Sequence, residues 1–120
     1  MESSIPDKGY VEIVLNSNCD WDIFHQTATL LESRLGLSFI KKINDFDSAY
    51  WDFFFRGSSL TLHYNVFFGV SLFPSAFKEA SAQDNENTVA LGELLLISNL
   101  YIDDLLRIRH FIELYLIKTN

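Results

Sequence analysis

Residues 50–64 read YWDFFFRGSSLTLHY and contain the clearest β-hairpin signal in the chain. Apolar and polar residues alternate on both sides of Gly57 and Ser58, and a two-residue loop with glycine first suits a type II′ turn. Such a turn pairs Arg56 with Ser59 and places Asp52 opposite His63. One face of the hairpin then carries core side chains, namely Trp51, Phe53, Phe55, Leu60, Leu62 and Tyr64. The other face carries Tyr50, Asp52, Phe54, Thr61, His63 and Asn65.

Three further segments alternate in the manner of β-strands. Residues 10–15 form the first strand of the chain, residues 39–43 precede the hairpin, and residues 67–73 follow it up to Pro74. Proline lacks the amide donor that a strand ladder requires, so the last strand ends there. The strands after residue 39 follow one another through short turns, which predicts a mostly antiparallel sheet.

Apolar residues at spacings of three and four predict helices on either side of this block of strands. The first helix follows the N-cap candidates Asn18 and Asp20 and ends at Gly36, the expected C′ residue. Residues 88–99 are apolar nearly all round, and residues 102–116 form an amphipathic pattern. The predicted order is β-α-β-β-β-β-α-α, which indicates a single α+β domain with helices packed on the sheet.

The length of 120 residues fits one domain, and 48% hydrophobic residues exclude a disordered chain. We expect residues 1–8 to be a loose terminus and the polar residues 81–87 to be an exposed loop or a frayed helix end. The single cysteine, Cys19, excludes an intramolecular disulfide. The amino terminus lacks a signal-peptide pattern, and the uncharged residues 60–77 alternate like strands. We therefore expect a cytoplasmic protein without a membrane span.

The charge balance restricts the class of partner. Nine basic and sixteen acidic residues give a net charge of −7 and a pI of about 4.7. A chain of this sign repels phosphate backbones, so direct binding of nucleic acid is not expected. A basic protein is the natural electrostatic complement. The alternative interpretation is that the charge keeps a phenylalanine-rich domain soluble.

The residues capable of chemistry do not form an enzyme motif. A cross-strand pair of Asp52 and His63 can orient an imidazole for general base catalysis, or be an ordinary polar pair on a half-exposed sheet. Cys19 lies in no known nucleophile signature, and His25, His63 and His110 have no metal-ligand spacing. We expect no enzymatic activity, no cofactor and no metal. A hydrolase that uses Asp52 and His63 is the alternative.

Acidic residues interleaved with aromatic ones suggest a binding surface. Asp45, Asp47 and Asp52 lie close to Phe46, Tyr50 and Trp51 in the sequence, and a second acidic group follows near the predicted loop. Aromatic side chains supply contact area and charges supply steering, so such a group suits a basic partner. A solvated turn with its aromatic side chains packed inward is the alternative. The predicted partner-binding residues are Asp45, Asp47, Tyr50, Asp52, His63, Glu79, Asp84 and Glu86.

A row of aromatic residues on the outward side of the strands is a second candidate surface, comprising Tyr50, Phe54, Phe67 and Phe73. Such a row is either covered by the carboxy-terminal helices or exposed for binding. Residues 94–117 contain much apolar surface that needs a partner, so we expect the helices to cover the row.

One series of segments comprises Tyr50 to Phe55, the Gly-Ser turn, the strand from Leu60 to Asn65 and the strand that closes at Phe73-Pro74. This series resembles small bacterial immunity proteins of contact-dependent growth inhibition systems. The resemblance covers residues 10–77. It implies an acidic cytoplasmic protein that binds and blocks a cognate toxin domain, often a nuclease. We expect the chain to be a monomer or a weak dimer. A nuclease must hold phosphates, so its basic surface suits an acidic inhibitor. An acidic, dimeric secretion chaperone that binds an effector segment is the leading alternative, and a structural subunit with an obligate aromatic interface is another.

Overall fold

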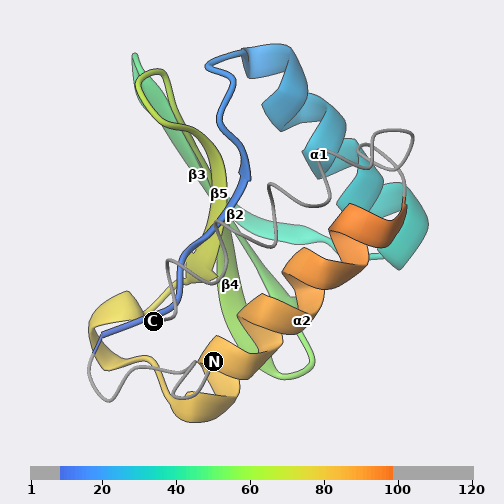
Figure 1. Cartoon of the computed structure of the whole chain (residues 1–120), viewed down its shortest axis with the longest axis vertical. Helices are drawn as coiled ribbons and strands as arrows, with labels where there is room; N and C mark the ends of the chain where they lie inside the picture. The colour runs from blue at the N-terminus through green and yellow to red at the C-terminus, as the bar shows by residue number, and fades with distance from the viewer. Residues whose placement is uncertain (1–8, 99–120) are drawn as a thin grey trace.

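The computed structural model describes residues 9–98. Its elements, in chain order, are β1 (Ile13–Asn16), α1 (Trp21–Leu35), β2 (Phe39–Asn44), β3 (Ser48–Phe55), β4 (Ser58–Asn65), β5 (Gly69–Pro74), the 3₁₀ helix η1 (Phe77–Glu79) and α2 (Ala82–Ser98). The strands form one antiparallel sheet in the order β1-β5-β4-β3-β2 (Figure 1). This confirms the predicted α+β class and order of elements. The helix predicted over residues 102–116 and the loose terminus predicted at residues 1–8 lie outside the described residues.

Both ends of α1 are those that the sequence predicts. The Asp20 carboxylate accepts a hydrogen bond from the backbone N–H of Asp22 at 2.8 Å, which satisfies a donor in the first helical turn. Gly36 adopts a left-handed conformation with φ 67°, and its N–H donates to the carbonyl oxygen of Glu32 at 3.1 Å. The apolar face of the helix buries Phe24 and Leu31 completely.

The β3–β4 hairpin has the predicted faces but a different register. Its turn is Arg56-Gly57, with φ of 54° and 86°, so that Phe55 pairs with Ser58. Two consecutive positive φ angles define a type I′ turn, and the predicted type II′ turn at Gly57-Ser58 is wrong. Cross-strand partners therefore shift by two residues. Because side chains alternate with a period of two, every residue stays on its predicted face.

Both helices pack on the same face of the sheet (Figure 1). α1 lies against β4 and β5, whereas α2 lies against β5, β4 and β1. The core between helices and sheet contains the fully buried side chains Ile13, Phe24, Leu31, Phe53, Leu60, Leu62, Tyr64, Leu72, Leu91 and Leu95. Each such burial contributes roughly 1.5–3 kcal/mol. This single core fixes the helices to one face and leaves the other face of the sheet uncovered by either described helix.

Of the two alternatives for residues 81–87, the exposed loop is wrong, because these residues lie at the start of a helix. α2 begins at Ala82, and a reciprocal capping box precedes it. The Asp84 N–H donates to Ser81 Oγ at 3.0 Å, and the Ser81 N–H donates to Asp84 Oδ2 at 3.1 Å. Asn85 and Asn87 are 2% and 3% exposed, because they face the sheet. Among residues 9–98, no helix combines the length and the apolar character needed to cross a membrane.

Candidate functional site

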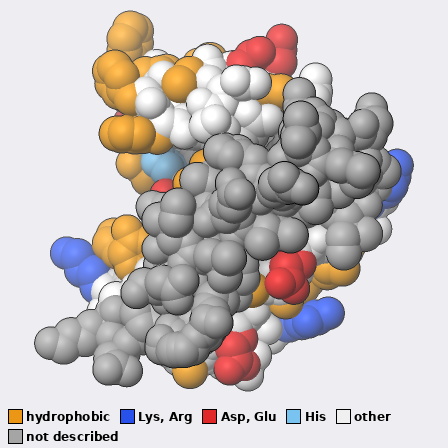
Figure 2. Space-filling view, in the orientation of Figure 1, with side chains coloured by type: hydrophobic (Ala, Val, Ile, Leu, Met, Phe, Trp, Pro, Cys, Tyr) orange, Lys and Arg blue, Asp and Glu red, His pale blue; other side chains and the backbone are white. Residues whose placement is uncertain are grey.

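The β2–β3 and β4–β5 turns lie side by side and expose three phenylalanines. Antiparallel pairing brings both turns to the same end of the sheet, where the Val66 N–H donates to the carbonyl oxygen of Asp47 at 3.0 Å. Phe46 is 100% exposed, Phe67 72% and Phe68 75%. Figure 2 shows hydrophobic side chains gathered at this end, at the upper left. We call the surface formed by Asp45, Phe46, Asp47, Phe67 and Phe68 the phenylalanine end.

Backbone hydrogen bonds and side-chain caps hold the two turns in place. The Asp45 N–H donates to the carbonyl oxygen of Ser48 at 2.8 Å. In the other turn, Asn65 Oδ1 accepts from the Phe67 N–H at 2.7 Å and the Asn65 carbonyl oxygen accepts from the Phe68 N–H at 3.1 Å. The exposed rings therefore stand on an ordered backbone, which lowers the entropic cost of binding a partner.

The start of the β1–α1 loop packs closely against Gly69, at the end of the β4–β5 turn. Gly69 has φ 91°, and a Cβ atom at this position would overlap the backbone of Asn16 and Ser17. Only glycine combines this conformation with this contact. The β1–α1 loop thus belongs to the same end of the molecule as the two turns.

The phenylalanine end carries acidic charge and no basic side chain. Asp45 is exposed and Asp47 half-buried on either side of Phe46, and neither residues 45–47 nor residues 66–68 include a lysine or arginine. The alternative that the aromatic side chains of this turn pack inward is wrong for Phe46. Asp45 and Asp47 flank the exposed Phe46 in the β2–β3 turn, whereas Asp52 of the same predicted group lies within β3 opposite Thr61.

A continuous row of aromatic side chains crosses the face opposite the helices, which we call the outer face. Tyr50 stacks on His63 with ring centroids 4.3 Å apart, and His63 contacts Phe73 at 5.5 Å. Tyr10 and Phe77 cover Phe73, which is 8% exposed, whereas Phe54 of the predicted outward row is 56% exposed. The described helix α2 lies on the other face, so it does not give the predicted cover. Residues 99–117 of the predicted cover lie outside the described residues.

Asp52 and His63 do not form the predicted cross-strand pair. Register places Asp52 opposite Thr61, and its carboxylate accepts a hydrogen bond from Thr61 Oγ1 at 2.6 Å. His63 lies opposite Tyr50, and its Nδ1 is 3.0 Å from the carbonyl oxygen of Ala49. The orientation of the imidazole therefore comes from an aromatic ring and a backbone carbonyl, and not from the Asp52 carboxylate.

The second predicted acidic group lies at the opposite end of the sheet. Asp84 closes the capping box and accepts a hydrogen bond from Ser58 Oγ at 2.7 Å, which ties α2 to the β3–β4 turn. The hydrogen bonds from the Ser81 N–H and the Ser58 hydroxyl lower the pKa of Asp84 from its ordinary value of 3.8. Glu79 and Glu86 are exposed on η1 and α2. The eight predicted residues therefore do not form one site.

Most of the chain is similar to one protein family. Residues 1–91 match a family described as a protein of unknown function, DUF3630. The chain belongs to the DUF3630 family. In this DUF3630 protein the matched segment extends from β1 through β5 into α2, so it includes both turns of the phenylalanine end. Neither the curated proteins nor the solved structures gave a match.

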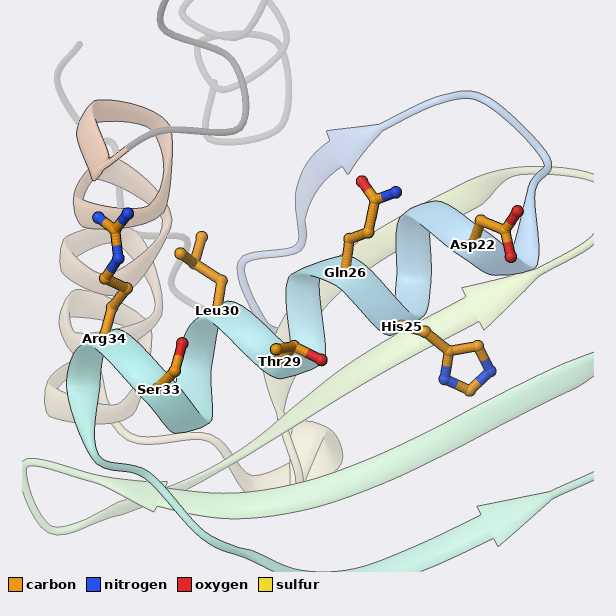
Figure 3. Close-up of a pocket in the computed structure, with 7 residues that line it drawn as sticks. All are labelled: Asp22, His25, Gln26, Thr29, Leu30, Ser33 and Arg34. Carbon is orange, nitrogen blue, oxygen red and sulfur yellow. The ribbon is translucent and has the colours of Figure 1, made fainter.

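A hollow of this DUF3630 protein lies along α1 and does not gather its polar side chains at one point. Its volume is about 490 Å³, and it is lined by Asp22, His25, Gln26, Thr29, Leu30, Ser33 and Arg34. All of these residues come from α1, and their side chains spread along the helix without converging on one point (Figure 3). Within residues 9–98, no group of three His, Cys, Asp or Glu side chains is placed to hold a metal ion.

The sequence did not predict Phe68 as a member of the site, and it placed Phe67 in the outward row of the strands. Residues 67–73 alternate well enough to predict one strand, yet β5 begins only at Gly69. A signal was present, because Asn65 and Gly69 bracket the two phenylalanines and both residue types are typical of tight turns.

Proposed function

We propose that this DUF3630 protein acts by binding another protein through the phenylalanine end, and that the partner is basic. The observation that carries the proposal is the exposure of Phe46, Phe67 and Phe68 on two turns joined by the Val66–Asp47 hydrogen bond. The specific role that fits is that of an immunity protein, which binds a toxin domain and blocks its activity.

Exposed phenylalanines on ordered turns favour a protein interface. A phenylalanine side chain buries on the order of 150–250 Å² when it is covered, so three of them provide a substantial apolar contact. Exposed clusters of this kind mark interaction sites, because water contact with apolar rings is unfavourable. Aromatic side chains at the centre of an interface commonly dominate its binding energy.

The acidic charge selects the class of partner. Asp45 and Asp47 flank the central ring, and the whole chain has a net charge of −7. Carboxylates at the rim of an interface accelerate association with a basic protein and repel an acidic one. A nuclease domain presents a basic surface because it must hold phosphates. The resemblance of residues 10–77 to immunity proteins supports the same class of partner.

The decisive experiment measures binding to a basic toxin domain encoded beside the gene of this protein. Biolayer interferometry at 50 mM and 300 mM salt would compare wild type with Phe46→Ser/Phe67→Ser/Phe68→Ser and with Asp45→Asn/Asp47→Asn. We expect the first variant to weaken affinity at least 100-fold, mainly through faster dissociation. We expect the second to slow association several-fold at low salt and much less at high salt.

The control variant is Glu79→Gln/Glu86→Gln, which removes the same charge at the opposite end of the sheet. Equal slowing of association in both charge variants would show that net charge alone matters and would contradict this site. Wild-type affinity of the triple serine variant would overturn the proposed interface. Inhibition of the nuclease at one-to-one stoichiometry supports the immunity role, whereas tight binding without inhibition leaves a binding protein of another kind.

A further inference from the structure

In the sheet formed by residues 9–98, β2 is an edge strand with exposed side chains. It ends the sheet beside β3, and apart from the half-buried Phe39 its residues are exposed, with Ile40 57% and Ile43 44% exposed. An edge strand leaves every second N–H and C=O without a strand partner, which makes it a template for an incoming strand. The other edge, β1, is four residues long and has a register shift between Val14 and Asn16. β2 is six residues long, and after its own register shift between Phe39 and Lys41 it pairs regularly with β3 from Lys41 to Asn44. β2 is therefore the better template.

A pair of lysines distinguishes this edge from the rest of the described surface. Lys41 and Lys42 are the only adjacent basic residues between residues 9 and 98. They project to opposite faces, because Lys41 lies opposite Asp52 of the outer face and Lys42 lies opposite Trp51 of the helix-covered face. Lys42 Nζ sits 4.3 Å from the centroid of the Trp51 ring, which holds this charge at the sheet edge.

We propose that β2 binds an extended acidic segment of another protein by strand addition. A strand paired with Lys41–Asn44 would bring its side chains beside one lysine on each face, so acidic residues on both faces of the incoming strand gain favourable cross-strand pairs. On the outer face, Ile43 lies beside Tyr50 in register and offers an apolar contact for a neighbouring side chain of that strand.

The same lysines exclude other occupants. A basic strand is repelled, and antiparallel pairing of two copies of β2 about residues 41 and 42 puts lysine opposite lysine. The site is independent of the phenylalanine end, since it selects the opposite sign of charge and uses different residues.

Fluorescence polarisation with synthetic ten-residue peptides tests this inference on the full chain. One labelled peptide alternates glutamate pairs with valine and isoleucine, and its control has lysine in place of every glutamate. We expect the acidic peptide to bind at least tenfold more tightly than the basic control. Lys41→Glu/Lys42→Glu should weaken binding at least tenfold, whereas the charge-matched variant Arg56→Glu/Lys78→Glu, whose residues lie outside β2, should retain it within threefold.

Backbone pairing is tested on the peptide, so that protein folding does not affect the result. Two further acidic peptides carry N-methyl groups on alternate residues, one set for each edge of the strand. Strand addition predicts that one of them binds at least tenfold more weakly and that the other does not. In NMR spectra of the protein, the unmethylated acidic peptide should shift the amide signals of Lys41–Asn44 and leave those of Phe46, Phe67 and Phe68 unchanged. Equal binding of both methylated peptides, or a stable dimer through β2 that the acidic peptide does not dissociate, would overturn the proposal.

Discussion

The backbone N–H of Val66 donates to the carbonyl oxygen of Asp47 at 3.0 Å, which joins the β2–β3 and β4–β5 turns. Hydrogen exchange can detect this link. We expect the Val66 amide to exchange at least tenfold more slowly than an unprotected amide, although it lies in a turn. In Asn65→Ala the Phe67 amide should lose its protection, because its acceptor is the Asn65 side chain, while Val66 keeps its own. Unprotected exchange at Val66 in the wild type would show that the turns move separately.

The phenylalanine end should contribute little to stability. Replacement of Phe46, Phe67 or Phe68 by serine should change the free energy of unfolding by no more than about 0.5 kcal/mol each, because the rings are already exposed. Phe53, which is fully buried, is the matched comparison, and Phe53→Ala should cost about 3–5 kcal/mol. Urea denaturation of each variant measures the difference. A large loss in any of the serine variants would mean that its ring is covered in the folded protein.

Gly69 should be far less replaceable than Gly57. Both have positive φ, 91° and 86°, so an L-residue is strained at either position by roughly 1–2 kcal/mol. At Gly69 a methyl group would also overlap the backbone of Asn16 and Ser17, whereas nothing lies near it at Gly57. Thermal unfolding should therefore show Gly69→Ala to be less stable than Gly57→Ala by at least about 1 kcal/mol. Equal losses would show that the β1–α1 loop moves aside freely.

Asp84 should make stability depend on acid pH. Its folded-state pKa is lowered by hydrogen bonds from Ser81 and Ser58, so its contribution is fully present above the ordinary value of 3.8 and is lost as pH falls through the lowered value. At pH 7, Asp84→Asn should reduce the free energy of unfolding by about 1 kcal/mol. The gap between wild type and variant should close as the pH falls below about 4.

The comparison variant for Asp84 is Glu86→Gln, which removes an equal charge from an exposed site on the same helix. Denaturant titrations at several pH values should show little change in its unfolding free energy relative to wild type. A gap for Asp84→Asn that stays constant from pH 7 to pH 2 would mean that the carboxylate does not close the capping box.

Local patterns were sufficient for the class of fold and for the faces of its strands. Asp20, the apolar spacing of α1 and Gly36 act within one helix, so their effect is visible in a short window. The faces of β3 and β4 follow from alternation alone, and an error of two residues in register leaves them unchanged. The register of the β3–β4 hairpin could not be predicted in this way, because its turn begins at Arg56. Arg56 has a positive φ, which is uncommon for a residue other than glycine.

Long-range partners account for most of what the sequence did not predict. Asn85 and Asn87 look like loop residues, yet Asn85 Oδ1 accepts from the Val11 N–H at 3.0 Å and Asn87 Nδ2 donates to Ser58 Oγ at 2.8 Å. Such bonds join segments far apart in the chain, and no local pattern encodes them. Asp84 was likewise assigned to binding from its charge, although the Ser81–Asp84 spacing is a helix-start signal.

The packing of Gly69 against Asn16 and Ser17 also has a practical use. Cys19 is the only cysteine of the chain, is exposed, and lies in the same β1–α1 loop, two residues after Ser17. A thiol-reactive dye attached there would sit at the same end of the molecule as the exposed rings without altering any of them. The protein thus carries a built-in labelling position from which the arrival of a partner could be observed optically.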